Sequence, residues 1–277
     1  MSEKFAPNFL NPEMKVGPLR NDEYGYGSFV DVGNIENLPE NVKEKAIHGY
    51  VIKKYRLSNN PITMASMLFV DGSEERKNGL SIEGIAKELK HRNSIMKNYF
   101  AESMPELVVP TQVIIGKDEK TNKKTIYEIQ SRLDEPNTAS KAGDPSLEPL
   151  YKFYLQGDES EKSKAEEVLD NFIAYIKVAF PEKIDLLKHE ISIFRREIRK
   201  MYATGDYLPY DCAKLNNLIF TRNGLRLVDS NAVVPVPPEE PSLASAGVNK
   251  RLKDDLAWRW NMFQGSLAVL KLIESKL

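Results

Sequence analysis

A β-hairpin is the local structure that this sequence specifies most strictly. Two short apolar runs, 218–220 and 225–228, are separated by a turn that contains Asn223-Gly224. Asn-Gly favours the tight turn of a hairpin, because both residues tolerate the positive φ angles that this turn requires. Asn216 precedes the first run and Asp229 follows the second. Since a hairpin folds its two ends back to one point, we expect these two polar residues to lie near each other.

The first half of the chain has the pattern of strands around a single helix. A glycine-punctuated stretch at 24–32 suits a strand, a turn and a second strand, and residues 48–56 suit a third strand. Apolar residues recur at helical spacing in 81–101. Two further strands are expected at 106–115 and 125–133, with a polar hairpin loop between them.

The second half is mainly helical. Residues 134–148 are rich in Pro, Ser, Gly and Asp, which is typical of a linker. Long amphipathic helices are expected at 163–179, 184–203 and about 250–276. The sequence therefore predicts an α+β protein with two domains, a strand-rich one at 1–133 and a helix-rich one at 134–277.

Composition argues against several classes of function. With 39 Lys+Arg against 40 Asp+Glu, the net charge of -1 gives no general attraction to nucleic acid or to an anionic membrane. The single cysteine, Cys212, excludes an internal disulfide, and three scattered histidines argue against a His-rich metal centre. No apolar run reaches the ~18 residues of a membrane helix, and the N-terminus has no apolar signal segment. We therefore expect a cytoplasmic protein with no nucleic-acid or membrane partner.

The segment around the hairpin resembles the catalytic loop and metal-binding turn of protein kinases and their small-molecule kinase relatives. The resemblance implies that Asp211 faces the acceptor hydroxyl and that Lys214 lies near the γ-phosphate. It also implies that Asn216 and Asp229 hold Mg²⁺ on the phosphates of ATP, with Asn217 as the alternative to Asn216. Carboxylate and amide oxygens are the ligands that this hard cation prefers.

Other segments follow in the order of the kinase family. Lys53 ends a Tyr-Val-Ile-Lys run that is similar to the Val-Ala-Ile-Lys strand, whose lysine reaches the α- and β-phosphates. Lys54 competes for this role, because adjacent residues of a strand point to opposite faces. The helix at 81–101 then corresponds to the family's helix αC. By its position Glu88 is the expected partner of Lys53, with Glu83 as the second choice.

The resemblance extends to residues that would contact the rest of the nucleotide. Backbone amides near the glycine-containing turn would cover the phosphates, and the end of the last strand of the first half would offer backbone groups to adenine. The predicted phosphate-covering residues are Gly25, Gly27 and Ser28, and the predicted adenine-binding residues are Glu128, Ile129 and Gln130. Asp255, in an Asp-Leu-Ala-Trp run, resembles the aspartate that braces the catalytic loop.

The sequence departs from the family at several points. Pro209-Tyr210 stands in place of the His-Arg that precedes the catalytic aspartate, and Ser230-Asn231 in place of Phe-Gly after the metal-binding aspartate. No Ala-Pro-Glu motif follows, and few residues remain for further helices. The resemblance therefore implies a bilobal kinase-like fold with an antiparallel-sheet N-lobe plus one helix and a minimal, mainly helical C-lobe.

The expected function is an ATP- and Mg²⁺-dependent transfer of the γ-phosphate to a hydroxyl acceptor. A protein Ser or Thr is slightly favoured as the acceptor over a small molecule. The altered glycine turn and the altered Asp-Phe-Gly motif keep a second possibility open, a pseudokinase-type module that binds nucleotide or a partner without turnover. A third possibility keeps the fold but transfers the nucleotidyl group of ATP.

One charged surface lies outside these motifs. Arg195, Arg196, Arg199 and Lys200 share one side of the helix expected at 184–203. Such a face is usually solvated, and an acidic partner is the alternative.

Overall fold

The computed structural model contains two compact units. The sheet unit comprises Met1–Leu68, Ser73–Asn93 and Val109–Asp134, and the helical unit comprises Phe69–Gly72, Ser94–Val108 and Glu135–Leu277. The residues described are 30–32, 50–55, 81–117, 122, 124–131, 133, 148–203, 207–209, 212, 215, 217–228, 234–235 and 246–277. Side chains are described for these residues except 30–32, 50–55, 148, 207–208, 234–235 and 246–260.

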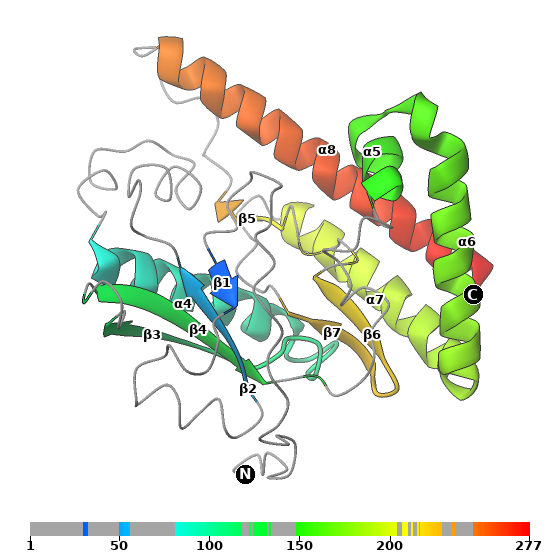
Figure 1. Cartoon of the computed structure of the whole chain (residues 1–277), viewed down its shortest axis with the longest axis horizontal. Coiled ribbons are helices and arrows are strands. Elements are labelled where there is room, and N and C mark those ends of the chain that lie inside the picture. The colour runs from blue at the N-terminus through cyan, green and yellow to red at the C-terminus, as the bar shows by residue number, and fades with distance from the viewer. Residues whose placement is uncertain are drawn as a thin grey trace. The chain divides into compact units, whose positions relative to one another are not determined.

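The division after residue 134 differs by one residue from the domain boundary expected from the sequence. The segment 94–108 was expected in the first domain, but its contacts place it with the helical unit. Together the described elements form an α+β protein with antiparallel sheets (Figure 1).

The sheet unit contains a four-stranded antiparallel sheet with the order β1-β2-β4-β3. The strands are β1 (Val30–Val32), β2 (Tyr50–Tyr55), β3 (Thr111–Lys117) and β4 (Lys124–Ser131). The predicted strands at 48–56 and 125–133 are confirmed. The strand predicted at 106–115 begins later, after Pro110, because proline has no N–H to donate to a ladder. The residues before Pro110 instead contact the helical unit's hairpin, through a bridge between Val108 and Leu227.

Helix α4 (Ile82–Phe100) confirms the predicted helix and its apolar face. Ser81 caps it, since the Ser81 Oγ accepts a hydrogen bond of 3.0 Å from the N–H of Gly84. Ile85, Leu89 and Met96 are buried. The first half of the helix belongs to the sheet unit and the second half to the helical unit, so one continuous helix contributes to both.

The helical unit is built from α5, α6, α7 and α8 together with two short strand pairs. The helices are α5 (Glu148–Gln156), α6 (Lys162–Ala179), α7 (Ile184–Ala203) and α8 (Ala246–Lys276), with single 3-10 turns η3 (Glu159–Glu161) and η4 (Pro181–Lys183). The strand pairs are β5 (Tyr207–Leu208) with β8 (Val234–Pro235) and β6 (Leu218–Thr221) with β7 (Gly224–Leu227). Three of these helices confirm the sequence prediction, whereas α5 begins at the end of the expected linker. In the part of the chain that is described, no helix combines the length and the apolarity needed to cross a membrane.

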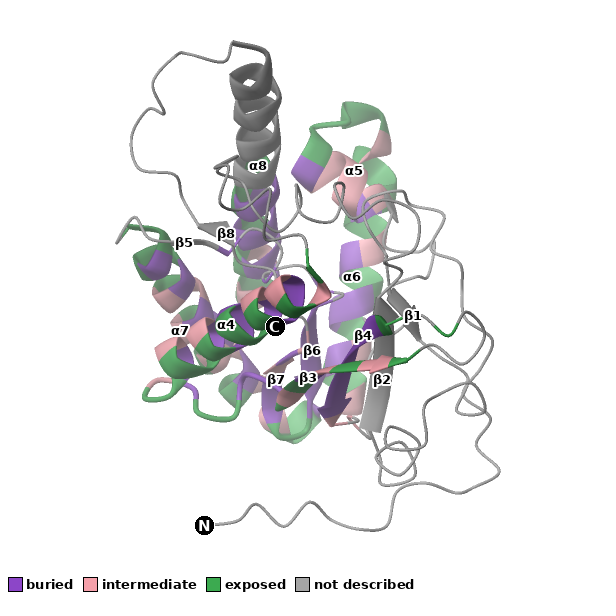
Figure 2. Cartoon of the chain, turned by 90° about the vertical axis from the view of Figure 1, so that its left-hand side faces the viewer, coloured by how far each residue is buried: buried purple, intermediate pink, exposed green. Residues whose placement is uncertain are grey.

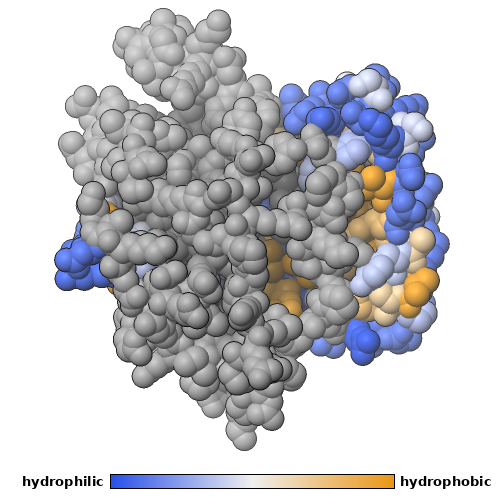
Figure 3. Space-filling model, in the orientation of Figure 1, coloured by the Kyte–Doolittle hydropathy of each residue, from blue (hydrophilic) through white to orange (hydrophobic). Residues whose placement is uncertain are grey.

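An aromatic and aliphatic core holds the helical unit together. The Phe100 and Phe194 rings stack with their centroids 5.6 Å apart, and Phe172 meets Phe220 edge to face at 5.3 Å. Cys212 is completely buried in the same core. Figure 2 shows the buried sides of α6, α7 and α8 in purple. The surface seen in Figure 3 is mostly hydrophilic where α5 and α6 lie, with a smaller hydrophobic area between.

Helices α5 and α8 approach closely because residue 265 of α8 is a glycine. A Cβ atom at Gly265 would meet the backbone of Tyr154 and Leu155 in α5. Helix α5 has only nine residues, too few for a stable isolated helix, and it packs against both α6 and α8. Its helical state depends on packing against its neighbours.

The β6–β7 hairpin confirms the strongest sequence prediction. Its turn contains Arg222 and Asn223, and Gly224 follows with a φ of 101°. The positive φ expected at both Asn223 and Gly224 is found only at Gly224 of the two. Thr221 stabilises the turn, because its Oγ1 accepts a hydrogen bond of 3.1 Å from the Asn223 N–H and donates one of 2.8 Å to the Gly224 carbonyl. The Leu225 N–H donates a hydrogen bond of 2.6 Å to Oε2 of Glu190, which ties the hairpin to α7.

We predict that Gly224→Ala destabilises the helical unit more than Gly157→Ala does. Both glycines have positive φ angles, 101° and 75°, so alanine strains the backbone at each by about 1–2 kcal/mol. A Cβ at Gly224 would also displace the Glu190 carboxylate and so break its hydrogen bond with the Leu225 N–H, whereas nothing lies within 4 Å of a Cβ at Gly157. Urea unfolding of the two variants measures the difference, expected to be about 1 kcal/mol or more. Equal losses would contradict the contact between Glu190 and the turn.

Candidate functional site

A buried carboxylate lies in the middle of the four-stranded sheet. The side chain of Glu128, in β4, is only 1% exposed. Its Oε1 accepts a hydrogen bond of 3.4 Å from Nδ2 of Asn93, which is buried on α4. Burial of a carboxylate is costly unless donors or a cation compensate it. The interior between the sheet and the first half of α4 is therefore polar at this point.

The strand register separates the two candidate lysines of β2. Lys53 is the direct partner of Glu128 in the antiparallel ladder, and Lys54 is the direct partner of Tyr127. Directly opposed residues of an antiparallel pair share one face of the sheet. Position 53 therefore shares its face with the buried carboxylate, and position 54 shares its face with Tyr127. The sequence left this choice open, because a shift of one residue exchanges the faces.

The helix carboxylates that were expected to pair with Lys53 have partners elsewhere. Glu88 is half-buried, and its Oε1 accepts a hydrogen bond of 2.9 Å from Nε of Arg92, one turn further along α4. Glu83 accepts one of 3.0 Å from Nζ of Lys124, and this hydrogen bond lowers the pKa of Glu83. Only the backbone of Lys53 is described, so its pairing with Glu88 stays a prediction.

The three residues expected to contact adenine lie inside the central strand of the sheet. Glu128, Ile129 and Gln130 are paired with β2 on one side and with β3 on the other. Their backbone groups therefore take part in two ladders. An adenine ring would compete with these ladders, and the predicted adenine contact stays a prediction.

In the helical unit, one hydrogen bond closes the open end of the hairpin. The Val228 N–H donates to the carbonyl of Asn217 at 2.9 Å, and the Asn217 residue is 7% exposed. In the sequence, Asn216 directly precedes Asn217 and Asp229 directly follows Val228. The hydrogen bond therefore joins the immediate chain neighbours of the two predicted metal ligands.

Several predicted site residues lie outside the described residues. They are Gly25, Gly27, Ser28, Asp211, Lys214, Asn216 and Asp229. Asp255 lies within α8, in the part of that helix whose side chains are not described. Among the described side chains, no group of three or more His, Cys, Asp or Glu residues is placed to hold a metal ion.

Glu190 supports the hairpin from α7. It is half-buried, and burial raises the pKa of its carboxyl above the ordinary value. The hydrogen bond from the Leu225 N–H and the positive charge of Arg226 lower this pKa and offset part of the rise. Arg226 in turn donates a hydrogen bond of 2.6 Å to Oε2 of Glu106. The hairpin is thus held by polar contacts to α7 and to the segment before β3.

Sequence reasoning missed the side chains of Glu128, Asn93 and Glu190. Asn93 lies between Leu89 and Met96 on the buried face of α4, and Glu128 interrupts a buried apolar strand. A polar residue at a core position of an amphipathic pattern is the signal that points to such residues. Glu190 carries no such signal, because its contact is with a distant turn.

No family model, no curated protein and no solved structure matches this chain. The fold itself defines the class of the molecule, an α+β protein with antiparallel sheets.

We predict that Asn93→Asp destabilises the protein by about 3 kcal/mol at pH 8, because it places a second carboxylate beside buried Glu128. Urea unfolding of the variant and the wild type at this pH measures the loss. Asn98→Asp makes the same change on the exposed side of α4 and should have little effect. Similar losses for both variants would argue against a close Asn93–Glu128 contact.

We predict that the stability difference between Glu190→Gln and the wild type changes with pH. The pKa of Glu190 is higher in the folded state than the ordinary carboxyl pKa. The protonated carboxyl therefore stabilises the fold fully at pH values below the ordinary pKa, and this contribution is lost as the pH rises through the raised pKa. The glutamine keeps an acceptor for the Leu225 N–H but does not titrate. As the pH increases from about 4 to about 7, the unfolding free energy of the variant should therefore rise relative to that of the wild type.

The matched control for this titration is Glu182→Gln, at an exposed position of η4. Its stability curve should run parallel to that of the wild type. If the Glu190 variant also ran parallel, burial of this carboxyl would not govern the pH dependence.

Proposed function

We propose that this protein is an ATP- and Mg²⁺-dependent phosphotransferase that transfers the γ-phosphate to a hydroxyl acceptor, with a protein Ser or Thr favoured over a small molecule. The observation that carries the proposal is the closed β6–β7 hairpin. Its last hydrogen bond, from Val228 to Asn217, joins the chain neighbours of Asn216 and Asp229. Phosphoryl transfer needs oxygen ligands for a metal at one point, which this hairpin supports.

The sheet unit supports the proposal independently. A lysine that binds phosphates must be charged and oriented, and a neighbouring carboxylate does both. The ladder register makes Glu128 the direct neighbour of position 53. We infer that Glu128 is the carboxylate that orients Lys53, while Glu88 is held by Arg92. The order of Lys53, α4 and the hairpin in the chain also agrees with the kinase-like resemblance.

The roles of the individual residues follow from their chemistry. Asp211 accepts the proton of the acceptor hydroxyl and aligns this nucleophile. Asn216 and Asp229 offer oxygen ligands, and Lys53 and Lys214 bind phosphate oxygens. When bound, Mg²⁺ neutralises the charge on the phosphates. The chain supplies alignment and charge, the two requirements of this transfer.

One observation favours nucleotide binding without turnover as a second candidate function. The α4 carboxylate Glu88, expected to orient the phosphate-binding lysine, is paired with Arg92. In protein kinases the lysine–glutamate pair must form for activity. A chain in which Glu128 cannot replace Glu88 would bind ATP without transferring its phosphate.

We predict that γ-labelled ATP is turned over with Mg²⁺ and that Asp211→Ala and Asp229→Ala each lower the rate by about 100-fold or more. The assay measures labelled protein, labelled Ser/Thr peptides and free phosphate, with and without EDTA. Asp185→Ala, at an exposed position in the first turn of α7, is the matched control and should keep the wild-type rate.

Lys53→Ala and Lys54→Ala form a second matched pair on one strand. The register predicts that only the Lys53 variant weakens binding of Mg²⁺–ATP. Binding without turnover in every assay would support the second candidate. Absence of both binding and turnover would contradict the proposal.

A further inference from the structure

Helix α7 carries a basic concavity that the proposed phosphotransfer site does not use. An open hollow of about 430 Å³ is lined by Ser192, Arg195, Arg196, Arg199, Lys200 and Ala203. These residues recur at helical spacing over about three turns of one face of α7. Four of the six are cationic, so this hollow concentrates positive charge.

Two carboxylates compensate only part of this charge. Arg195 forms an ion pair with Glu274 of α8. Glu197 accepts hydrogen bonds from Nε of Arg196 at 2.7 Å and from Nζ of Lys200 at 3.1 and 3.3 Å. Arg199 forms no hydrogen bond or ion pair with any residue in the described part of the chain. Among the residues that the structure describes, four cations of this face are therefore compensated by only two carboxylates.

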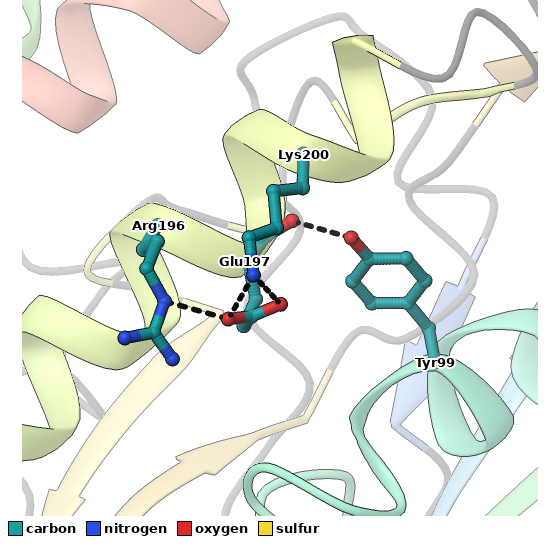
Figure 4. Close-up of polar contacts among 4 residues, drawn as sticks. All are labelled: Tyr99, Arg196, Glu197 and Lys200. Atoms are coloured by element: carbon teal, nitrogen blue, oxygen red, sulfur yellow. Dashed lines mark hydrogen bonds and ion pairs between the residues drawn. The ribbon is translucent and has the colours of Figure 1, made fainter.

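The cations around Glu197 are held in place before any ligand binds. The Tyr99 hydroxyl of α4 donates a hydrogen bond of 2.9 Å to the Glu197 carbonyl, and Figure 4 shows Arg196 and Lys200 converging on the Glu197 carboxylate. Burial raises the pKa of Glu197, but the hydrogen bonds from Arg196 and Lys200 outweigh it and leave the pKa below the ordinary value. Glu197 is thus ionised at neutral pH and fixes both side chains.

The guanidinium groups retain unused hydrogen-bond donors. Arg195 uses Nη1 for Glu274, while its Nε is buried and has no acceptor among the described residues. Arg196 uses only its Nε in the described contacts. Each guanidinium carries five N–H donors in a planar fork that matches phosphate oxygens. Of these donors, only Nε of Arg195 is buried without an acceptor among the described residues. Together the donors match an acceptor with several charged oxygens.

We propose that this face of α7 binds a small molecule that carries phosphate groups. Arginine forks recognise phosphate in bidentate geometry, and lysine adds a point charge. The hollow has the volume of a site for a small ligand rather than for a single ion. The proposal uses none of the residues assigned to phosphoryl transfer, so it stands or falls independently of the proposed function.

The test is a titration of the full chain with inorganic tripolyphosphate in the presence of EDTA. Isothermal calorimetry measures the dissociation constant. Arg199→Ala and Arg196→Ala should each weaken binding by about 10-fold or more. Arg199→Lys keeps the charge but loses the fork and should give an intermediate loss. Lys162→Ala removes one charge from an exposed position on α6 and should change affinity by less than about 2-fold.

Four outcomes would overturn the proposal. The first is absence of tripolyphosphate binding, and the second is equal weakening by Arg199→Ala and Lys162→Ala. The third is tighter binding of a phosphoserine peptide with the same dependence on Arg199, which would assign the face to a phosphorylated protein. The fourth is equal affinity for citrate, a polyanion without phosphate, which would show general anion attraction only. Thermal unfolding of each variant checks that the fold is kept.

Discussion

The helical unit depends on the packing of the β6–β7 turn against helix α7, where Glu190 contacts the turn. The Glu190 carboxylate occupies the space that a side chain at Gly224 would fill, and it accepts the Leu225 N–H. On the other strand Phe220 packs edge to face on Phe172 of α6. The turn, two helices and the hairpin therefore fix one another. The end of the hairpin, where the metal ligands are proposed, is held by this packing and by the Val228–Asn217 hydrogen bond.

The sheet unit is organised around a different constraint, the burial of a carboxylate. Glu128 lies in a strand with ladder partners on both sides and beneath a helix that supplies Asn93. A carboxylate in such surroundings is retained only where its charge or its hydrogen bonds are needed. Its position opposite Lys53 gives a physical reason for this burial under the proposed function.

Much of the fold could be predicted because long helices and an Asn-Gly hairpin leave strong local signals. The apolar face of α7, with Ile191 and Phe194, specifies that helix without any tertiary information. Helix α5 was not predicted because so short a helix depends on tertiary packing, here against α6 and, at Gly265, against α8. The choice between Lys53 and Lys54 also required the structure, since strand register is a tertiary property. The Arg92 partner of Glu88 lies one helical turn away, and the sequence alone does not decide between this local partner and Lys53.

The complete burial of Cys212 has a practical consequence for following this molecule in solution. It is the chain's one thiol, and it lies in the hydrophobic core of the helical unit. A maleimide reagent can reach it only when that core opens, so the labelling rate reports the frequency of opening without any engineered probe. The native thiol thus serves as a built-in probe of opening in the helical unit.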